Sequence, residues 1–386
     1  MYDIQALRQD QFPLSSEQVY FNHASISPLP RSVFEQAHRA LAGLAGNPDR
    51  FFLEEGLPLY TGLSGHAQRF LHAAEPEEVI PVASTYAALA VVATAIPWQE
   101  GENVIFCDIE FPSNAFPWMT LPAAGVEARR VPAAGGGLAL ETLLPWVDDK
   151  TRVVAASAIQ FFTGHRTNLA AIGAFCRERG ILFVVDAIQA IGHMAIDVEE
   201  IKIDVVASGG QKSLLSVPGI GLLYVRSDVA ETLQPRPLGP NATRDYMHWL
   251  GYDLTPLPGA QRFGSGTPNV PGLFALEASL SLLEELGVAN IDRHTTTLAA
   301  AAIAMLERLG YEVITPPGHG PIVTFCPQLD DEGADRAVAA LAERAIFISK
   351  RWDAARTPYL RLSFHAYNTV EELQRFEDAW REIAGR

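Results

Sequence analysis

Short apolar runs, each ended by a polar or glycine-rich turn, recur through the first two thirds of the chain. The clearest lie at 104–107, 153–159, 181–185 and 205–207. Runs of this kind are typical of buried parallel strands. Between them apolar residues recur at helical spacing, as over 170–179. Strands that alternate with helices in this way indicate an α/β fold with a parallel sheet.

The pattern changes after residue 269, where two long stretches of helical spacing are followed by three short apolar runs and a terminal amphipathic helix. We therefore predict a three-layer α/β/α large domain with a mostly parallel sheet and a smaller α+β domain. The expected boundaries are 21–269 for the large domain and 270–386 for the small domain. Residues 1–20 form an N-terminal segment, loop-like over most of its length, that we expect to pack with the small domain.

Composition and charge narrow the function. The 386 residues carry a formal net charge of −16, which argues against nucleic acid or an anionic membrane surface as the partner. No apolar run is long enough to span a membrane, and the first residues lack the features of a signal peptide. The three cysteines suggest buried thiols, and no cluster has metal-ligand spacing. We expect a cytoplasmic, metal-free protein.

Two chemically reactive side chains stand at the ends of predicted strands. Asp186 ends the run at 181–185, and Lys212 follows the run at 205–207 through a turn of small residues. In open α/β sheets, ligands bind at the edge where parallel strands end. A lysine buried there has a lowered pKa and a nucleophilic amine. An aldehyde cofactor is the natural partner, and pyridoxal 5′-phosphate (PLP) requires both a lysine and an acid opposite its ring nitrogen.

Three motifs around these residues resemble a known family. They are D-A-x-Q-x-x-G from Asp186, D-V-V-x-S-G-x-Q-K ending at Lys212, and P-G-I-G-x-L-Y-V-R just after it. The pattern resembles the class V aminotransferases, fold-type I PLP enzymes that include cysteine desulfurases, kynureninase, isopenicillin-N-epimerase-like proteins and alanine–glyoxylate transaminases. The resemblance implies that Lys212 forms the Schiff base with PLP and then acts as base at Cα. It implies that Asp186 bonds the ring nitrogen and that Gln189 contacts the ring's phenolic side.

The resemblance also implies a set of cofactor contacts. A serine and a threonine open an Ala/Val-rich helix, an arrangement that caps a helix and binds phosphate. An aromatic residue is expected to stack on the ring, and either of two polar residues after the run at 153–159 to contact its hydroxyl. A Gly-Thr turn is expected to reach the phosphate in a neighbouring subunit, which implies a homodimer. The residues are Ser84, Thr85, Phe111, Gln160 or Thr163, Ser208, Gln211, Gly266 and Thr267.

Substrate contacts are implied at both ends of the chain. The motif R-x-S-x-x-x-Y-N-T-x-E-E begins at Arg361, whose guanidinium is suited to clamp the α-carboxylate of an amino acid. Asn22 and His23 match the family's N-terminal segment that passes over the active site.

We therefore expect a PLP-dependent enzyme acting on an α-amino acid, with transaminase chemistry of the class V type. The alternative is a β-lyase acting on a C–S or C–Se bond, or an epimerase. A persulfide-forming desulfurase is not expected, because the loop before Arg361 has no cysteine and Gln211 replaces the usual histidine before Lys212. A PLP-fold regulator without turnover would be expected to lose Lys212, Asp186 or Arg361, and all three are present. A nucleotide-binding protein would carry a glycine-rich fingerprint, which this chain lacks.

Overall fold

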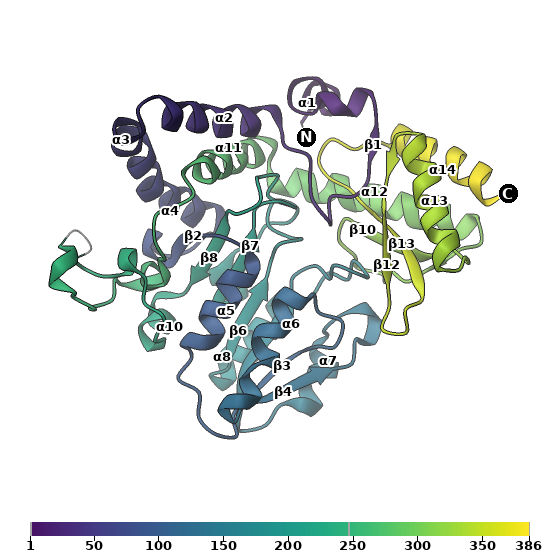
Figure 1. Cartoon of the computed structure of the whole chain (residues 1–386). Helices are drawn as coiled ribbons and strands as arrows, with labels where there is room; N and C mark the ends of the chain where they lie inside the picture. The colour runs from purple at the N-terminus through teal and green to yellow at the C-terminus, as the bar shows by residue number, and fades with distance from the viewer. Residues whose placement is uncertain (1, 246–247, 386) are drawn as a thin grey trace.

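The computed structural model describes residues 2–245 and 248–385. Within them the chain forms a seven-stranded sheet between layers of helices, and beside it a smaller four-stranded sheet (Figure 1). The large sheet has the strand order β2-β8-β7-β6-β5-β3-β4. Its strands are β2 (Val79–Val82), β3 (Asn103–Cys107), β4 (Glu127–Val131), β5 (Thr151–Ser157), β6 (Leu182–Asp186), β7 (Val205–Gly209) and β8 (Gly221–Val225).

The large sheet is mostly parallel, as the sequence predicted. Only β8 runs antiparallel to its neighbours β2 and β7 among the described strands. Successive residues of a strand face opposite sides of its sheet, so a strand covered on both sides is apolar throughout. On β6, Phe183 and Val185 belong to one core, whereas Leu182 and Val184 belong to the other. The prediction of a three-layer α/β/α domain is confirmed.

Helices cover both faces of this sheet. One face packs against α5 and α6, and the other against α4, α8 and α11. None of the helices formed by the described residues combines the length and apolar character that a membrane span requires. The larger helices of this part are α2 (Arg31–Gly46), α4 (Leu57–Leu71), α5 (Thr85–Ala95), α6 (Pro112–Met119), α8 (Leu169–Arg179), α10 (Ser227–Thr232) and α11 (Val270–Leu286).

The smaller sheet has the order β12-β13-β10-β9, and its described pairs are all antiparallel. It shares a separate apolar core with three helices. The elements are α12 (Val288–Arg308), β9 (Glu312–Val313), β10 (Ile322–Cys326), α13 (Asp331–Glu343), β11 (Ile346–Phe347), β12 (Ser349–Trp352), β13 (Pro358–Ser363) and α14 (Val370–Ala384).

The boundary between the two cores differs from the expected one at 269/270. Helix α11 packs against α2 and α4 and buries Leu273, Leu276 and Leu280 in a core of the large domain. The change occurs within α12, where Ile291 still belongs to that core and Leu298 belongs to the small-domain core. An amphipathic pattern shows that a helix has a buried face but not which domain covers it, which is why the sequence placed α11 in the small domain.

The N-terminal segment is more regular than expected. Residues taken as a loop form α1 (Ile4–Gln11), whose first turn is capped by the Asp3 side chain accepting hydrogen bonds from Gln5 N and Ala6 N. Only Leu7 is buried along this helix. A single buried position leaves little amphipathic signal in the sequence, which explains the missed helix.

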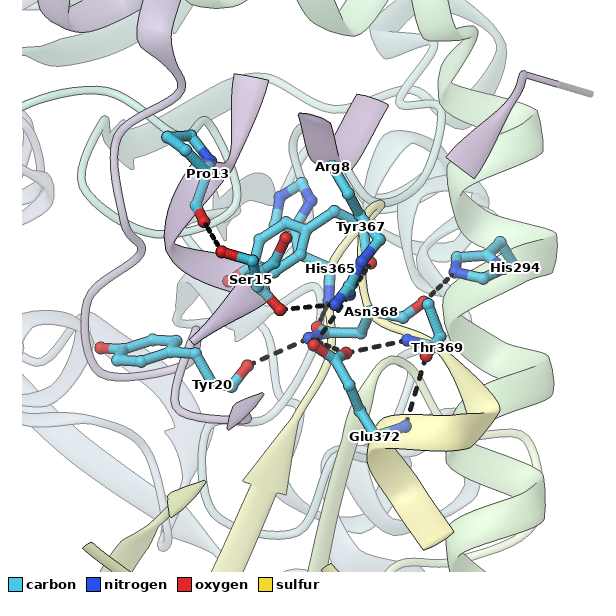
Figure 2. Close-up of polar contacts among 11 residues, drawn as sticks. Arg8, Pro13, Ser15, Tyr20, His294, His365, Tyr367, Asn368, Thr369 and Glu372 are labelled. Carbon is cyan, nitrogen blue, oxygen red and sulfur yellow. Dashed lines mark hydrogen bonds and ion pairs between the residues drawn. The ribbon is translucent and has the colours of Figure 1, made fainter. Parts of the chain in front are cut away.

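Contacts with the C-terminal part hold this segment in place, as Figure 2 shows. Strand β1 (Val19–Tyr20) pairs in parallel with β11. The Arg8 guanidinium donates to Tyr367 O at 2.9 Å and to the buried Glu372 carboxylate at 2.8 Å. Glu372 also accepts from Asn368 Nδ2 and from Thr369 N, so it joins the N-terminal helix to the first turn of α14. The N-terminal segment is thus tied to the C-terminal part through β1 and Arg8, while Leu7 and Phe12 pack into a core of the large domain.

Candidate active site

Asp186 and Lys212 meet at one edge of the large sheet. Asp186 is the last residue of β6, and Lys212 follows the end of the adjacent strand β7 by three residues. A cavity of about 390 Å³ opens at this edge, and the small domain contributes two of the residues around it. The lining consists of Ala24, Ser25, Ser84, Thr85, Tyr86, Phe111, Ser113, Phe161, Asp186, Ile188, Gln211, Lys212, Arg351 and Arg361.

A larger hollow of about 620 Å³ lies against α2, α4 and α11, away from the strand ends. Its arginine, Arg39, is paired with Glu55 and lies over the ring of Phe274. We place the chemistry in the smaller cavity, because the reactive lysine lines it.

The backbone around Lys212 is held from three directions. Gln211 O accepts from Ser27 N at 2.8 Å, and Ser213 O accepts from the His365 Nε2 of the small domain at 3.0 Å. The Ser213 hydroxyl donates to Ile188 O at 2.8 Å, just beyond Asp186. The lysine stem therefore starts from a point fixed by the N-terminal segment, the small domain and the turn after β6.

Burial and charge shape the reactivity of the Lys212 amine. The residue is 7% exposed, and its Nζ lies 5.0 Å from the centre of the Phe111 ring. Burial is the main cause that lowers the pKa of Lys212 to about 8; the Asp186 charge opposes it, and the cationic Arg361 and Arg351 act in the same direction as burial. A substantial fraction of the amine is therefore neutral near physiological pH, which a nucleophile or a base at carbon requires.

Asp186 remains mostly ionised at neutral pH despite its burial. Loss of solvation raises its pKa to about 6, whereas the bond it accepts from Ile188 N and the charge of Lys212 lower it. A buried carboxylate at this position can accept a charge-assisted hydrogen bond from a protonated ring nitrogen. Such bonds contribute about 1.5–3 kcal/mol.

Phe111 is positioned by a buried carboxylate beside it. Glu110 accepts from Ser157 N at 2.9 Å and from the Ser157 hydroxyl, which fixes the chain at the end of β3. Burial raises the pKa of Glu110 to about 7. Phe111 then forms the N-cap of α6, and Pro112 at the first helical position suits that start. The Phe111 ring lies edge-on to Phe161 at 5.1 Å.

The start of α5 fits a phosphate group. Ser84 caps the helix by accepting from Ala87 N, and the Thr85 hydroxyl accepts from Gly209 N at 2.8 Å on β7. A helix start offers unpaired N–H groups and a partial positive charge to an anion. Gln211, which lines the same cavity, lies close to Gly209. Together with Lys212 and Asp186, these residues fit PLP.

The structure does not bring four of the expected cofactor contacts into the cavity lining. The Gln160 amide is engaged by Ile109 O and Phe162 N, and the Thr163 hydroxyl donates to Gly136 O. Each side chain bonds the backbone of a distant segment, and neither candidate for the ring-hydroxyl contact is among the residues that line the cavity. The Ser208 hydroxyl donates to Gly209 O, and Gln189 Nε2 donates to Ala24 O at 2.8 Å. Gln189 therefore positions the N-terminal segment that forms one wall.

The two substrate contacts expected near the N-terminus, Asn22 and His23, are not among the residues that line the cavity. Asn22 Oδ1 accepts from the Ser25 hydroxyl at 2.6 Å, and Ser25 lines the cavity. His23 is 1% exposed and bonds Ser27 Oγ at 2.9 Å, behind the wall of the cavity. Gly266 and Thr267 lie in a surface segment and are not part of this chain's cavity lining.

Arg361 lines the cavity as expected, and a second arginine that the sequence reasoning missed lies beside it. Arg361 Nη1 donates to Phe161 O at 2.6 Å, and both Arg361 and Arg351 donate to Ser25 Oγ. The sequence shows two adjacent cations, Lys350 and Arg351, shortly before Arg361. Only the strand pairing shows which of the two faces the cavity.

Comparison with known proteins agrees with this geometry. The model of the family described as aminotransferase class-V matches residues 19–376. The chain belongs to the class V aminotransferase family. PLP is the cofactor of these enzymes, as the arrangement of Lys212 and Asp186 led us to expect.

Relatives in this family carry two kinds of name. An uncharacterized aminotransferase of Bacillus subtilis is 31% identical over 313 residues, covering 81% of this chain and 80% of the relative. A probable cysteine desulfurase of Methanothermobacter thermautotrophicus is 30% identical over 395 residues, covering 98% of both chains. Among solved structures, a mutant of C-DES with glycine covalently linked to PLP has a TM-score of 0.89 at 22% identity. It covers 100% of this chain and 99% of its own, and it shows the shared fold.

Replacing Asp186 by Asn should lower the pKa of Lys212 below its value of about 8. The Asp186 charge raises this pKa, so its removal leaves burial and two arginines, which all act in the opposite direction. The pH dependence of Lys212 modification by an amine-reactive reagent in the cofactor-free protein, read by mass spectrometry, measures the shift. Asp197→Asn is the control, since Asp197 caps the short helix α9 (Val198–Ile201), Asn caps it equally well, and Asp197 does not line the cavity. An unchanged or higher pKa in Asp186→Asn contradicts the pairing.

Proposed function

We propose that this class V enzyme transfers the amino group of an α-amino acid. The observation that carries the proposal is the buried Lys212 amine, with its lowered pKa, in one cavity with Asp186 and Arg361. The aminotransferase name of the Bacillus subtilis relative supports it.

Each residue has a definite task in this proposal. Bound PLP withdraws electrons from the Cα of the amino acid joined to it, which makes the Cα proton removable. The neutral Lys212 amine takes that proton. Asp186 accepts a hydrogen bond from the ring nitrogen and favours its protonated form. Arg361 holds the α-carboxylate, so that the Cα–H bond is presented to Lys212.

The lining favours transamination over epimerisation. No second amine, imidazole or thiol is found among the described residues that line the cavity. Lys212 must therefore both remove the Cα proton and return it. With PLP bound, Lys212 would take and return the proton on one side of the substrate, and water would then release the keto acid while the cofactor kept the amino group. Epimerisation needs a proton donor on the opposite face of the substrate, and the half-exposed Tyr86 phenol is the one further acid of that kind in the described lining.

The second candidate is β-elimination from a sulfur- or selenium-containing amino acid. The relatives named cysteine desulfurases favour it, and one of them aligns over nearly the whole chain. Elimination requires only Lys212 as base and a leaving group at Cβ. A persulfide-forming desulfurase additionally requires a reactive thiolate with access to the substrate. Burial raises the pKa of Cys107 and of Cys176 to about 12, and Cys326 ends β10 outside the cavity lining.

We also propose a homodimer with shared active sites. Gly266 and Thr267 belong to a surface segment whose earlier part exposes Leu250, Tyr252 and Leu254, each more than 70% accessible. Apolar side chains exposed this far are typical of an interface. We expect sedimentation equilibrium of the purified protein to give the mass of two chains. A single-chain mass at all concentrations contradicts the shared site.

Borohydride reduction tests the central assignment. The purified protein should absorb as a PLP enzyme, and reduction should fix the cofactor on the peptide that contains Lys212. Lys212→Ala should abolish the label. Lys350→Ala should retain it, because Lys350 is paired with Asp331 and Asp335 away from the cavity. Cofactor fixed on another lysine contradicts the proposal. A second measurement distinguishes transfer from elimination: in amino transfer, keto acid forms in repeated turnovers only when an amino acceptor is added.

Replacing all three cysteines by alanine should leave turnover largely intact. The two buried thiols are core groups, so their loss should cost about 1 kcal/mol each in the free energy of unfolding. Turnover of the triple variant and mass spectrometry of the wild type for a protein persulfide are the measurements. A persulfide on one cysteine, with activity abolished by replacing that residue alone, restores the desulfurase assignment.

A further inference from the structure

Two arginines lie next to each other on the face of the small sheet that closes the cavity. Strands β12 and β13 are antiparallel, and their register pairs Arg351 with Tyr359 and Ser349 with Arg361. The two arginines are therefore diagonal neighbours, whose side chains share one face of the sheet. Both line the cavity with Lys212.

Both guanidinium groups are bound to the same neutral oxygen. Arg351 Nη2 and Arg361 Nη2 each donate to Ser25 Oγ, whose own proton goes to Asn22 Oδ1. A hydroxyl has one donor and two acceptor positions, so Ser25 is fully used. The serine holds the two cations in a fixed relation but supplies no charge to balance them.

No carboxylate among the described residues lies within ion-pair distance of Arg351 or Arg361. Arg361 is 1% exposed, and its Nε has no hydrogen-bond partner in this part of the chain. The adjacent Lys350, on the opposite face of β12, shows the contrast, since it is paired with Asp331 and Asp335. Burial, and the repulsion of Arg351, hold the pKa of Arg361 well below its usual range.

The two guanidinium groups carry more positive charge than one α-carboxylate can balance. A single guanidinium can bind a carboxylate through two parallel hydrogen bonds. If Arg361 takes the α-carboxylate in that way, Arg351 remains a partly buried cation without a counter-charge. An uncompensated buried charge is strongly unfavourable, so a ligand that supplies a second anionic group gains from filling the position. Asp186, the one carboxylate of the lining, faces Lys212 and the ring nitrogen.

We infer that the substrate is an α-amino acid with an acidic side chain, whose second carboxylate is bound by Arg351 while Arg361 binds the α-carboxylate. This inference rests on the proposed function and specifies its substrate class. Arg351 suits the side-chain carboxylate because its backbone contact, a bond from Nη1 to Lys350 O, is local to β12. Arg361 is held by its bond to Phe161 O on the large domain, the domain that also carries Lys212.

The test compares succinate, a dicarboxylate, with butyrate, a monocarboxylate of the same chain length, on the PLP-loaded enzyme. Affinities are measured by calorimetry and by the change in the cofactor's absorption. The wild type should bind succinate more tightly by about tenfold to a hundredfold, the worth of one charge-assisted interaction. Arg351→Gln should remove this preference and leave butyrate affinity unchanged. Arg361→Gln should weaken both ligands.

Two further variants keep the result interpretable. Arg351→Lys retains the charge without the fork and should keep part of the preference for succinate. Lys350→Gln changes the neighbouring cation on the outer face and should alter neither affinity. Circular dichroism and thermal unfolding establish that each variant is folded, and a misfolded Arg351→Gln protein leaves Arg351→Lys to report the preference.

Two results overturn the inference. The first is a wild type that binds butyrate as tightly as succinate. The second is an Arg351→Gln variant that loses affinity for both ligands equally, which would mean that both arginines hold one carboxylate. Failure of the proposed function gives a different result. In that case the enzyme prefers succinate through Arg351 but transfers no amino group from any amino acid. If the enzyme transfers amino groups efficiently from monocarboxylic amino acids alone, the proposed function stands and only the inference of an acidic substrate is overturned.

Discussion

The desolvation of Lys212 is the constraint on which the site depends. An amine keeps its proton in water, and only burial makes it a base near neutral pH. That burial requires contributions from distant parts of the chain: Phe111 after β3, Ser27 in the N-terminal segment, and His365 after β13. His365 Nδ1 accepts from Ala366 N, which leaves the proton on Nε2 for the carbonyl next to Lys212. The two domains and the N-terminal segment thus meet on the residues that flank one lysine, Gln211 and Ser213.

The charge of the cavity is opposite to that of the whole protein. The chain carries a formal charge of −16, yet the lining places Lys212, Arg351 and Arg361 against a single carboxylate, Asp186. Desolvated cations of this kind are costly to the fold and useful only to an anionic ligand. Surface carboxylates at a distance do not compete for the site, because surface charges are screened over about 10 Å at moderate salt.

Much of this could be predicted from sequence, and the limits have physical causes. The central strands β3, β5, β6 and β7 lie on the predicted runs, because strands covered on both faces are apolar throughout. Asp186 and Lys212 were predictable because strand ends carry the chemistry in parallel sheets. Arg351 was not, because a shift of one residue in the register of β12 would exchange it with Lys350. The domain boundary and the roles of Gln160 and Gln189 depend on contacts far along the chain, which local pattern does not contain.

The joining of both chain ends has a consequence for protein synthesis. Tyr2 bonds Ala366 O and Arg8 bonds Glu372, each across 364 positions of sequence. At about 5–20 residues per second, the first residues to leave the ribosome wait roughly 20 to 70 seconds for these partners. During that time the large sheet can form, but the carbonyl beside Lys212 lacks its histidine. A fragment that ends before residue 365 lacks the histidine that holds the carbonyl beside Lys212, so this side of the lysine loses its fixed support.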